Sequence, residues 1–154
     1  MNSLRVWRLC PATYAADPFS GVGGLYFPAR WHNKGRRIVY TAESRSLAAL
    51  EILANSHDRA AFAARPWVLA WADIPLPMVE NPATYPDDWR AHPPPASTRA
   101  FGDAWLAAAR SPALRVPSAV IAGEFNYLLN PAHPGFAQIR LGPPESFSFD
   151  PRLR

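Results

Sequence analysis

The chain has few of the features that mark secreted or membrane proteins. It contains a single cysteine, Cys10, so no disulfide can form within it. No apolar run approaches the roughly 20 residues that span a bilayer. Residues 1–8 lack the apolar core and the small-residue cleavage site of a signal peptide. These absences predict a cytoplasmic protein that has no membrane partner.

Ligands for a metal ion are also sparse. The four histidines are far apart and show no paired ligand spacing: His32, His57, His92 and His133. Cys10 has only Leu9 and Pro11 as neighbours, which supply no charge to stabilise a thiolate. We therefore expect no bound metal and no cofactor, and we interpret Cys10 as a small core residue.

Lysine is nearly absent, and arginine supplies the positive charge. Lys34 is the single lysine among 16 basic residues, and the formal net charge is +4. The arginines are scattered singly or in pairs, and they form no basic helix and no aromatic–basic module. Direct nucleic-acid binding is therefore not expected. The positive surplus instead favours an anionic small molecule or an acidic protein partner.

What the sequence does contain is typical of one globular domain. Its 154 residues, 49% of them hydrophobic, can bury a core and predict a single domain over residues 1–154. Strands are predicted at residues 5–9, 38–41, 67–74, 116–121, 136–141 and 145–150. Helices are predicted at residues 44–54 and 101–108. Residues 75–98 and 126–134 are expected to be irregular, because both are rich in turn residues.

A glycine-rich segment at residues 21–24 has the composition of a dinucleotide-binding loop. The third glycine of that fingerprint would fall at Tyr26, and no helix is expected to follow. A Rossmann-type site is therefore disfavoured.

The helix predicted after Ser44 carries one charged residue where apolar residues are expected. Every residue from 47 to 54 is apolar except Glu51, which completes the stripe made by Leu47, Leu50 and Ala54. We expect this helix to be buried nearly all round. An unpaired buried carboxylate costs several kcal/mol, so Glu51 needs a partner or a ligand. It is either half of a structural ion pair with a core arginine or a carboxylate at the floor of a cleft.

Three residues near this helix form a chemically coherent set, namely Arg30, Tyr40 and Glu51, with Arg8 and Ser118 as accessories. Arginine presents a planar fork that suits a phosphate group. Tyrosine offers its ring face to a cationic or aromatic ring. A glutamate can accept a hydrogen bond from a sugar hydroxyl and oppose positive charge on a ribosyl carbon. The set describes a pocket for a ribosyl phosphate that bears a leaving ring.

The accessory residues leave two questions open. Arg8 is either an inward arginine or an edge charge of the strand at residues 5–9. Ser118 lacks the flanking glycines of a nucleophile elbow, so a hydrogen-bonding or structural serine is favoured over a nucleophile.

Several short sequence motifs occur one after another along the chain. They are Trp7-Arg8-Leu9, Arg30-Trp31-His32 with Lys34-Gly35, Val39-Tyr40-Thr41-Ala42-Glu43-Ser44, Leu47-Ala48-Ala49-Leu50-Glu51, Val116-Pro117-Ser118-Ala119-Val120, Asn126-Tyr127-Leu128-Leu129-Asn130-Pro131 with His133-Pro134, and Phe149-Asp150-Pro151-Arg152-Leu153. Together they resemble the RES-domain toxins of bacterial toxin–antitoxin systems, from about Val6 to about Leu153. Pro28-Ala29 replaces the Gly-Gly usual in that family, which stiffens the loop before Arg30.

This resemblance implies a compact mixed α/β fold similar to that of ADP-ribosyltransferases, with mixed or antiparallel sheets flanked by short helices. It also implies an enzyme that cleaves NAD by glycohydrolysis or phosphorolysis, with NAD as substrate rather than cofactor. Some relatives instead transfer ADP-ribose to a protein. By position, Arg30, Tyr40 and Glu51 match the family's active-site residues, and Ser118 and more weakly Arg8 and Asn126 line the pocket.

The resemblance further implies a protein partner. The usual partner is an antitoxin with an Xre-type helix-turn-helix domain, which covers the active-site entrance and lets the complex bind DNA through its own domain. A non-catalytic module that binds a nucleotide or a partner is the rival interpretation. The sequence leaves open whether the chain forms a homo-oligomer.

Overall fold

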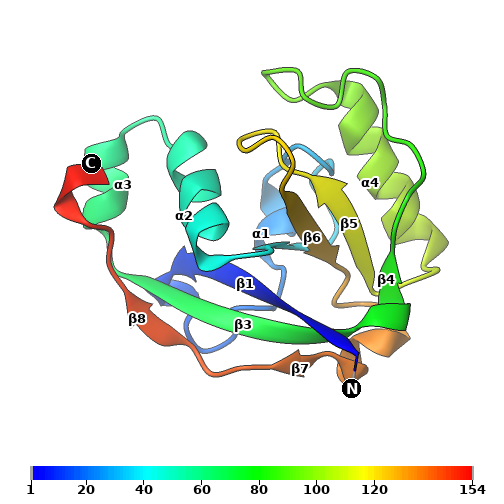
Figure 1. Ribbon diagram of the computed structural model, residues 1–154, viewed down its shortest axis with the longest axis horizontal. Coiled ribbons are helices and arrows are strands. Elements are labelled where there is room, and N and C mark those ends of the chain that lie inside the picture. The colour runs from blue at the N-terminus through cyan, green and yellow to red at the C-terminus, as the bar shows by residue number, and fades with distance from the viewer. Residues whose placement is uncertain (1, 154) are drawn as a thin grey trace.

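The computed structural model describes residues 2–153, which form one curled, mixed β-sheet with helices packed on it (Figure 1). The strands are β1 (Ser3–Pro11), β2 (Val39–Ala42), β3 (Trp67–Pro75), β4 (Val79–Glu80), β5 (Ala113–Pro117), β6 (Phe125–Leu129), β7 (Arg140–Leu141) and β8 (Glu145–Phe147). The helices are α1 (Gly23–Tyr26), α2 (Arg45–Ala54), α3 (Arg59–Ala64) and α4 (Ala96–Ala108). None of these helices has the length and hydropathy needed to cross a membrane.

The order of strands brings segments that are distant in sequence to the centre of the sheet. The order is β4-β5-β6-β2-β1-β3-β7, with β8 also paired to β3. The pairings between these strands are antiparallel, except that β4 and β5 run parallel. The predicted mixed α/β fold is confirmed. Because β2 lies between β1 and β6, it places Tyr40 opposite Leu128 and Ala42 opposite Trp7.

The predicted strands in the first half of the chain are confirmed as β1, β2 and β3. Alternation in β1 places Val6 in one apolar cluster and Leu9 in another, as the period of two requires. The first four residues of the apolar run in β3 are buried. Along this stretch β1 pairs with one edge of β3, and β8 pairs with the other edge at Trp67–Leu69.

The predictions for residues 116–134 are correct at Val116–Pro117 and at residues 130–133, and wrong at residues 118–129. The expected strand at 116–121 ends at Pro117, and a turn begins at Ser118. The segment expected to be a loop from Asn126 starts instead with β6, which pairs with both β2 and β5. Asparagine is unusual in a strand, and its turn propensity was overridden here by pairing on both edges.

Short elements account for the other differences. The strand expected at 136–141 is mostly a 3-10 turn, Pro134–Gln138, followed by the two residues of β7. The strand expected at 145–150 is limited to the three residues of β8. Helix α3 forms where no element was predicted. Helix α1 begins within the glycine-rich segment at residues 21–24, although no helix was expected there.

Helix α2 begins as predicted but is not buried all round. The Ser44 side chain accepts a hydrogen bond from Leu47 N at 3.1 Å, which confirms the N-cap. Leu50 is 38% exposed and Ala54 is exposed, so the predicted apolar stripe is wrong. The buried residues are Leu47, Ala48 and Leu53. Glu51 is half-buried at the boundary of that face.

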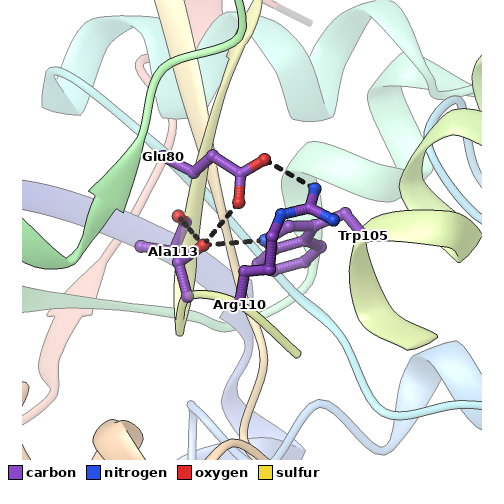
Figure 2. Close-up of polar contacts among 5 residues, drawn as sticks. Glu80, Trp105, Arg110 and Ala113 are labelled. Atoms are coloured by element: carbon purple, nitrogen blue, oxygen red, sulfur yellow. Dashed lines mark hydrogen bonds and ion pairs between the residues drawn. The ribbon is translucent and has the colours of Figure 1, made fainter. Parts of the chain in front are cut away.

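Helix α4 is anchored to the β4–β5 edge of the sheet by a polar network at its C-terminal end. Trp105 Nε1 donates to Ser111 Oγ at 3.0 Å, and this hydroxyl lies within hydrogen-bonding distance of Glu80 Oε1 and Ala113 O. Arg110 Nη2 donates to Glu80 Oε2 at 2.9 Å, as Figure 2 shows. This network fixes where α4 lies across the sheet. The helix itself begins at Ala96, five residues earlier than predicted.

The middle of α4 holds the loop that carries Arg30. Asp103 accepts two hydrogen bonds from Asn33, from its backbone N at 3.0 Å and from its Nδ2 at 2.7 Å. Gly102 lies against the same loop, and a Cβ there would come within 1.6 Å of Trp31 O. Glycine costs helix stability, so its presence in α4 is explained by this close approach.

We expect Gly102→Ala to lower the free energy of unfolding by about 1–3 kcal/mol, because the added methyl group forces α4 away from the Trp31 backbone. Urea unfolding measures the change. Gly23→Ala is the matched control, since a Cβ on Gly23 meets nothing within 4 Å. Equal effects of the two substitutions would contradict the proposed packing.

Candidate active site

A cavity of about 460 Å³ opens between α2, the central strands and the loop at residues 28–31. Five residues predicted from the sequence line it together: Arg8, Arg30, Tyr40, Glu51 and Asn126. They come from β1, the loop, β2, α2 and β6, so only the folded sheet brings them into one place. Their catalytic and binding roles remain predictions.

The Glu51 carboxylate is oriented by two neutral donors. Ser118 Oγ donates to Glu51 Oε2 at 2.7 Å, and Asn126 Nδ2 donates to the same oxygen at 2.6 Å. Among residues 2–153, no group donates a hydrogen bond to Oε1. Three ion pairs occur in this part of the chain, Arg5–Asp73, Arg110–Glu80 and Arg152–Asp150. Among residues 2–153, Glu51 is therefore not half of a structural ion pair, and it lies on the wall of an open cavity.

Ser118 is fully buried behind Glu51. Its Oγ accepts hydrogen bonds from the backbone N of Val120 at 3.1 Å and of Ile121 at 3.0 Å. A hydroxyl has one proton and two lone pairs. Because the lone pairs serve the turn after β5, the proton is directed to the carboxylate. The serine thus couples the shape of that turn to the position of Glu51.

Arg30 keeps its positive charge without a carboxylate partner among the described residues. Its Nη1 donates to Trp89 O at 2.9 Å and to Ala91 O at 2.6 Å, which fixes the guanidinium against the segment between β4 and α4. Burial lowers the pKa of Arg30, and the nearby Glu51 carboxylate opposes this shift. Arginine still remains protonated at neutral pH. A partly desolvated cation of this kind favours an anionic ligand.

Arg8 is an inward arginine, which answers the question left open by the sequence. Its Nε donates to Pro18 O at 2.8 Å, and its Nη1 donates to Tyr40 O at 3.3 Å. Burial lowers its pKa, and among the described residues no carboxylate lies within ion-pair distance. Two arginines thus line the cavity, and neither forms an ion pair among the described residues.

Two residues of the loop that carries Arg30 hold the Tyr40 side chain at its hydroxyl. The hydroxyl accepts a hydrogen bond from Trp31 N at 3.2 Å and lies 2.7 Å from His32 Nδ1. Burial raises the pKa of Tyr40 far above its ordinary value, so the phenol stays protonated. His32 is itself buried, and its Nε2 lies 2.9 Å from Phe27 O. The hydroxyl is thus occupied by protein groups.

The loop before Arg30 tolerates Pro28-Ala29 without backbone strain. Among residues 2–153, Ala109 is the one non-glycine residue with a positive φ, so neither Pro28 nor Ala29 occupies a glycine-only conformation. Ala29 N donates to His32 O at 3.1 Å and closes the turn. Both residues line the cavity.

Sequence reasoning missed much of the apolar lining of the cavity. These residues include Trp7, Ile52, Phe62 and Val120. Two of them belong to elements that were not predicted, α3 and the turn after β5. Trp7 lies in a motif that was recognised, and the Arg45 guanidinium stacks over its ring at 3.9 Å. In the described part of the chain, no group of three or more histidine, cysteine or acidic residues could hold a metal ion.

The family model of the RES domain matches residues 5–150 of the chain. The chain belongs to the RES-domain family. A RES relative named "Toxin Res" from Yersinia enterocolitica is 34% identical over 152 residues, which cover 98% of this chain and 100% of the relative. A second relative, "Prs ADP-ribosylating toxin" from Sphingobium sp., is 33% identical over 96% of this chain and 94% of its own length.

The RES fold also has a counterpart among solved structures. A chain in the crystal structure of the M. tuberculosis MbcT–MbcA toxin–antitoxin complex matches with a TM-score of 0.76 and 20% identity. The match covers 99% of this RES domain and 87% of that chain. The predicted family is confirmed, and the two proteins share a fold.

We expect the stability of this RES domain to fall as the pH drops below about 6.5, the ordinary pKa of an unfolded histidine. Burial lowers the pKa of folded His32, so the unfolded chain binds the proton first and is favoured by acid. Arginine partners lower the pKa values of the Asp73 and Asp150 carboxyls. Protonation of these two carboxyls therefore reduces the stability only below about pH 4.

Urea unfolding at about pH 7.5 and 5.5 measures this effect. His32→Asn removes the titrating group, so the loss of stability between the two pH values should be smaller in that variant. The same loss in both proteins would show that His32 does not carry the effect.

Proposed function

We propose that this RES domain is the toxin of a toxin–antitoxin system and cleaves the bond between nicotinamide and ribose in NAD. One observation supports this most directly. A single cavity holds the Glu51 carboxylate, fixed by neutral donors, together with Arg8 and Arg30, which lack carboxylate partners among the described residues. A dinucleotide complements this arrangement, because it offers sugar hydroxyls to the carboxylate and a diphosphate to the arginines.

The chemistry needs little acid catalysis, because the nicotinamide of NAD is a cationic leaving group. The electron pair of the C1′–N bond leaves with the ring, which becomes neutral, and C1′ becomes oxocarbenium-like. Glu51 would accept a hydrogen bond from the ribose 2′-OH that strengthens as positive charge grows. Water then adds to C1′ and loses a proton to give ADP-ribose, whereas phosphate would give the phosphorylated sugar.

The other side chains would act by positioning. Arg30 would hold the diphosphate, with its orientation set by the carbonyls it already contacts, and Arg8 would supply a second cation. The Tyr40 ring would stack on or position the nicotinamide. Ser118 and Asn126 would keep Glu51 aimed at the sugar. Most of the acceleration would then come from positioning and electrostatic stabilisation.

A protein ADP-ribosyltransferase is the nearer alternative. The name of the Sphingobium relative, 33% identical to this chain, favours it. A protein nucleophile would meet the same cation in the same cavity, so the two activities differ only in the acceptor. Mass spectrometry identifies the transferase by a mass increase of one ADP-ribose on a target protein.

The partner we propose is a small antitoxin with an Xre-type helix-turn-helix domain, which covers the entrance of the cavity. The toxin names of the relatives and the toxin–antitoxin complex with the same fold support an antitoxin. The net charge of +4 suits an acidic partner surface. Because the substrate is the cellular NAD pool, we place the protein in the cytoplasm. Adding the antitoxin should stop nicotinamide release.

Glu51→Gln is expected to reduce nicotinamide release from NAD by roughly 100-fold or more, because the charge that opposes the ribosyl cation is lost. The free energy of unfolding should change by about 1 kcal/mol or less, since an amide oxygen can still accept from Ser118 and Asn126. Chromatography of free nicotinamide, with and without phosphate, measures turnover.

Glu145→Gln on β8 is the matched control, because it makes the same chemical change at an exposed position. It should leave turnover unchanged. A wild-type protein that releases no nicotinamide in either buffer would contradict NAD cleavage. Binding of NAD by calorimetry without release would instead support the non-catalytic module.

A further inference from the structure

We infer that His32 is a positioning residue for the NAD reaction, which fixes the Tyr40 ring in the cavity wall by accepting a hydrogen bond at Nδ1. This inference rests on the proposed function. His32 does not line the cavity, so it would act only through Tyr40.

The hydrogen bonds determine which nitrogen of His32 carries the proton. Nε2 lies 2.9 Å from Phe27 O, and a carbonyl oxygen can only accept, so Nε2 is the donor. Burial lowers the pKa of His32, although Phe27 O and the Asp103 carboxylate oppose this, so the ring is neutral at pH 7. In a neutral ring the other nitrogen is an acceptor. The Tyr40 hydroxyl oxygen lies 2.7 Å from Nδ1, so the hydroxyl donates a hydrogen bond to Nδ1.

The Tyr40 hydroxyl thus acts both as a hydrogen-bond donor and as a hydrogen-bond acceptor. It donates to His32 Nδ1 and accepts from Trp31 N at 3.2 Å. The two rings lie side by side with centroids 5.5 Å apart and an interplanar angle of 48°. Because a hydroxyl bound from two sides fixes the end of the side chain, the ring face along the cavity is fixed as well.

The same contacts couple Tyr40 to Arg30. Trp31 and His32 directly follow Arg30, so the loop that binds the hydroxyl also carries the guanidinium. The loop is in turn held by Asp103 of α4 through Asn33. Loss of the Nδ1 acceptor would therefore release the Tyr40 ring without removing any group that touches NAD.

Two substitutions at His32 separate the two hydrogen bonds of its ring. In His32→Asn the amide oxygen can occupy the position of Nδ1 and still accept from Tyr40, but the bond to Phe27 O is lost. In His32→Gln the amide nitrogen can occupy the position of Nε2 and still donate to Phe27 O, but the acceptor for Tyr40 is lost. Each variant loses one buried hydrogen bond, so a purely structural role predicts equal effects.

We expect His32→Asn to keep kcat for nicotinamide release within about threefold of the wild type, and His32→Gln to lose roughly 10-fold or more. Urea unfolding should show similar losses of stability in both. In a Tyr40→Phe background, which lacks the hydroxyl, the two variants should give the same turnover. Equal turnover of the two variants in the wild-type background would overturn the inference.

The nitrogen-15 NMR spectrum gives a readout that does not depend on turnover. Nδ1 of His32 should show the chemical shift of a non-protonated ring nitrogen at pH 7, and this shift should move in Tyr40→Phe. A protonated Nδ1 would overturn the inference. If the wild type binds NAD but releases no nicotinamide, the proposed function fails, and the comparison of His32→Asn with His32→Gln is read from the dissociation constant for NAD.

Discussion

The two hydrogen bonds received by Glu51 Oε2 are the interaction on which the site depends. They join α2 to the turn after β5 and to the start of β6, more than 60 residues further along the chain. Neutral donors orient a carboxylate and leave its negative charge in place, whereas an arginine partner would neutralise that charge. The sheet order is what makes this possible, because β6 lies between β5 and β2, and β2 leads directly into α2.

A second constraint comes from the loop between α1 and β2. Helix α4 holds it from outside through Gly102 and Asp103, and the Tyr40 hydroxyl holds it from within. The loop carries Arg30, so the cation and the aromatic ring of the cavity are fixed relative to each other. None of the residues in the polar network of Figure 2 lines the cavity, yet the network sets the position of α4 and so supports this loop.

The sequence predicted the parts of the fold that have strong local periodicity. Alternation in β1, the apolar run in β3 and the Ser44 cap of α2 were all confirmed, because each is decided by neighbours in the chain. Prediction failed between residues 118 and 129, where Asn126 has a local preference for turns. Pairing of β6 with a strand on each side outweighed that preference.

For the site, the sequence by itself determined the chemical types: one acidic residue in an apolar helix, an arginine beside a turn and a tyrosine in a short strand. It also determined the family, through motifs that keep their order along the chain. Only the tertiary structure decided that Glu51 faces an open cavity rather than an arginine, that Ser118 lies behind it, and that His32 contacts Tyr40. The physical reason is that hydrogen-bond partners and burial depend on strand register, which residues distant in sequence set together.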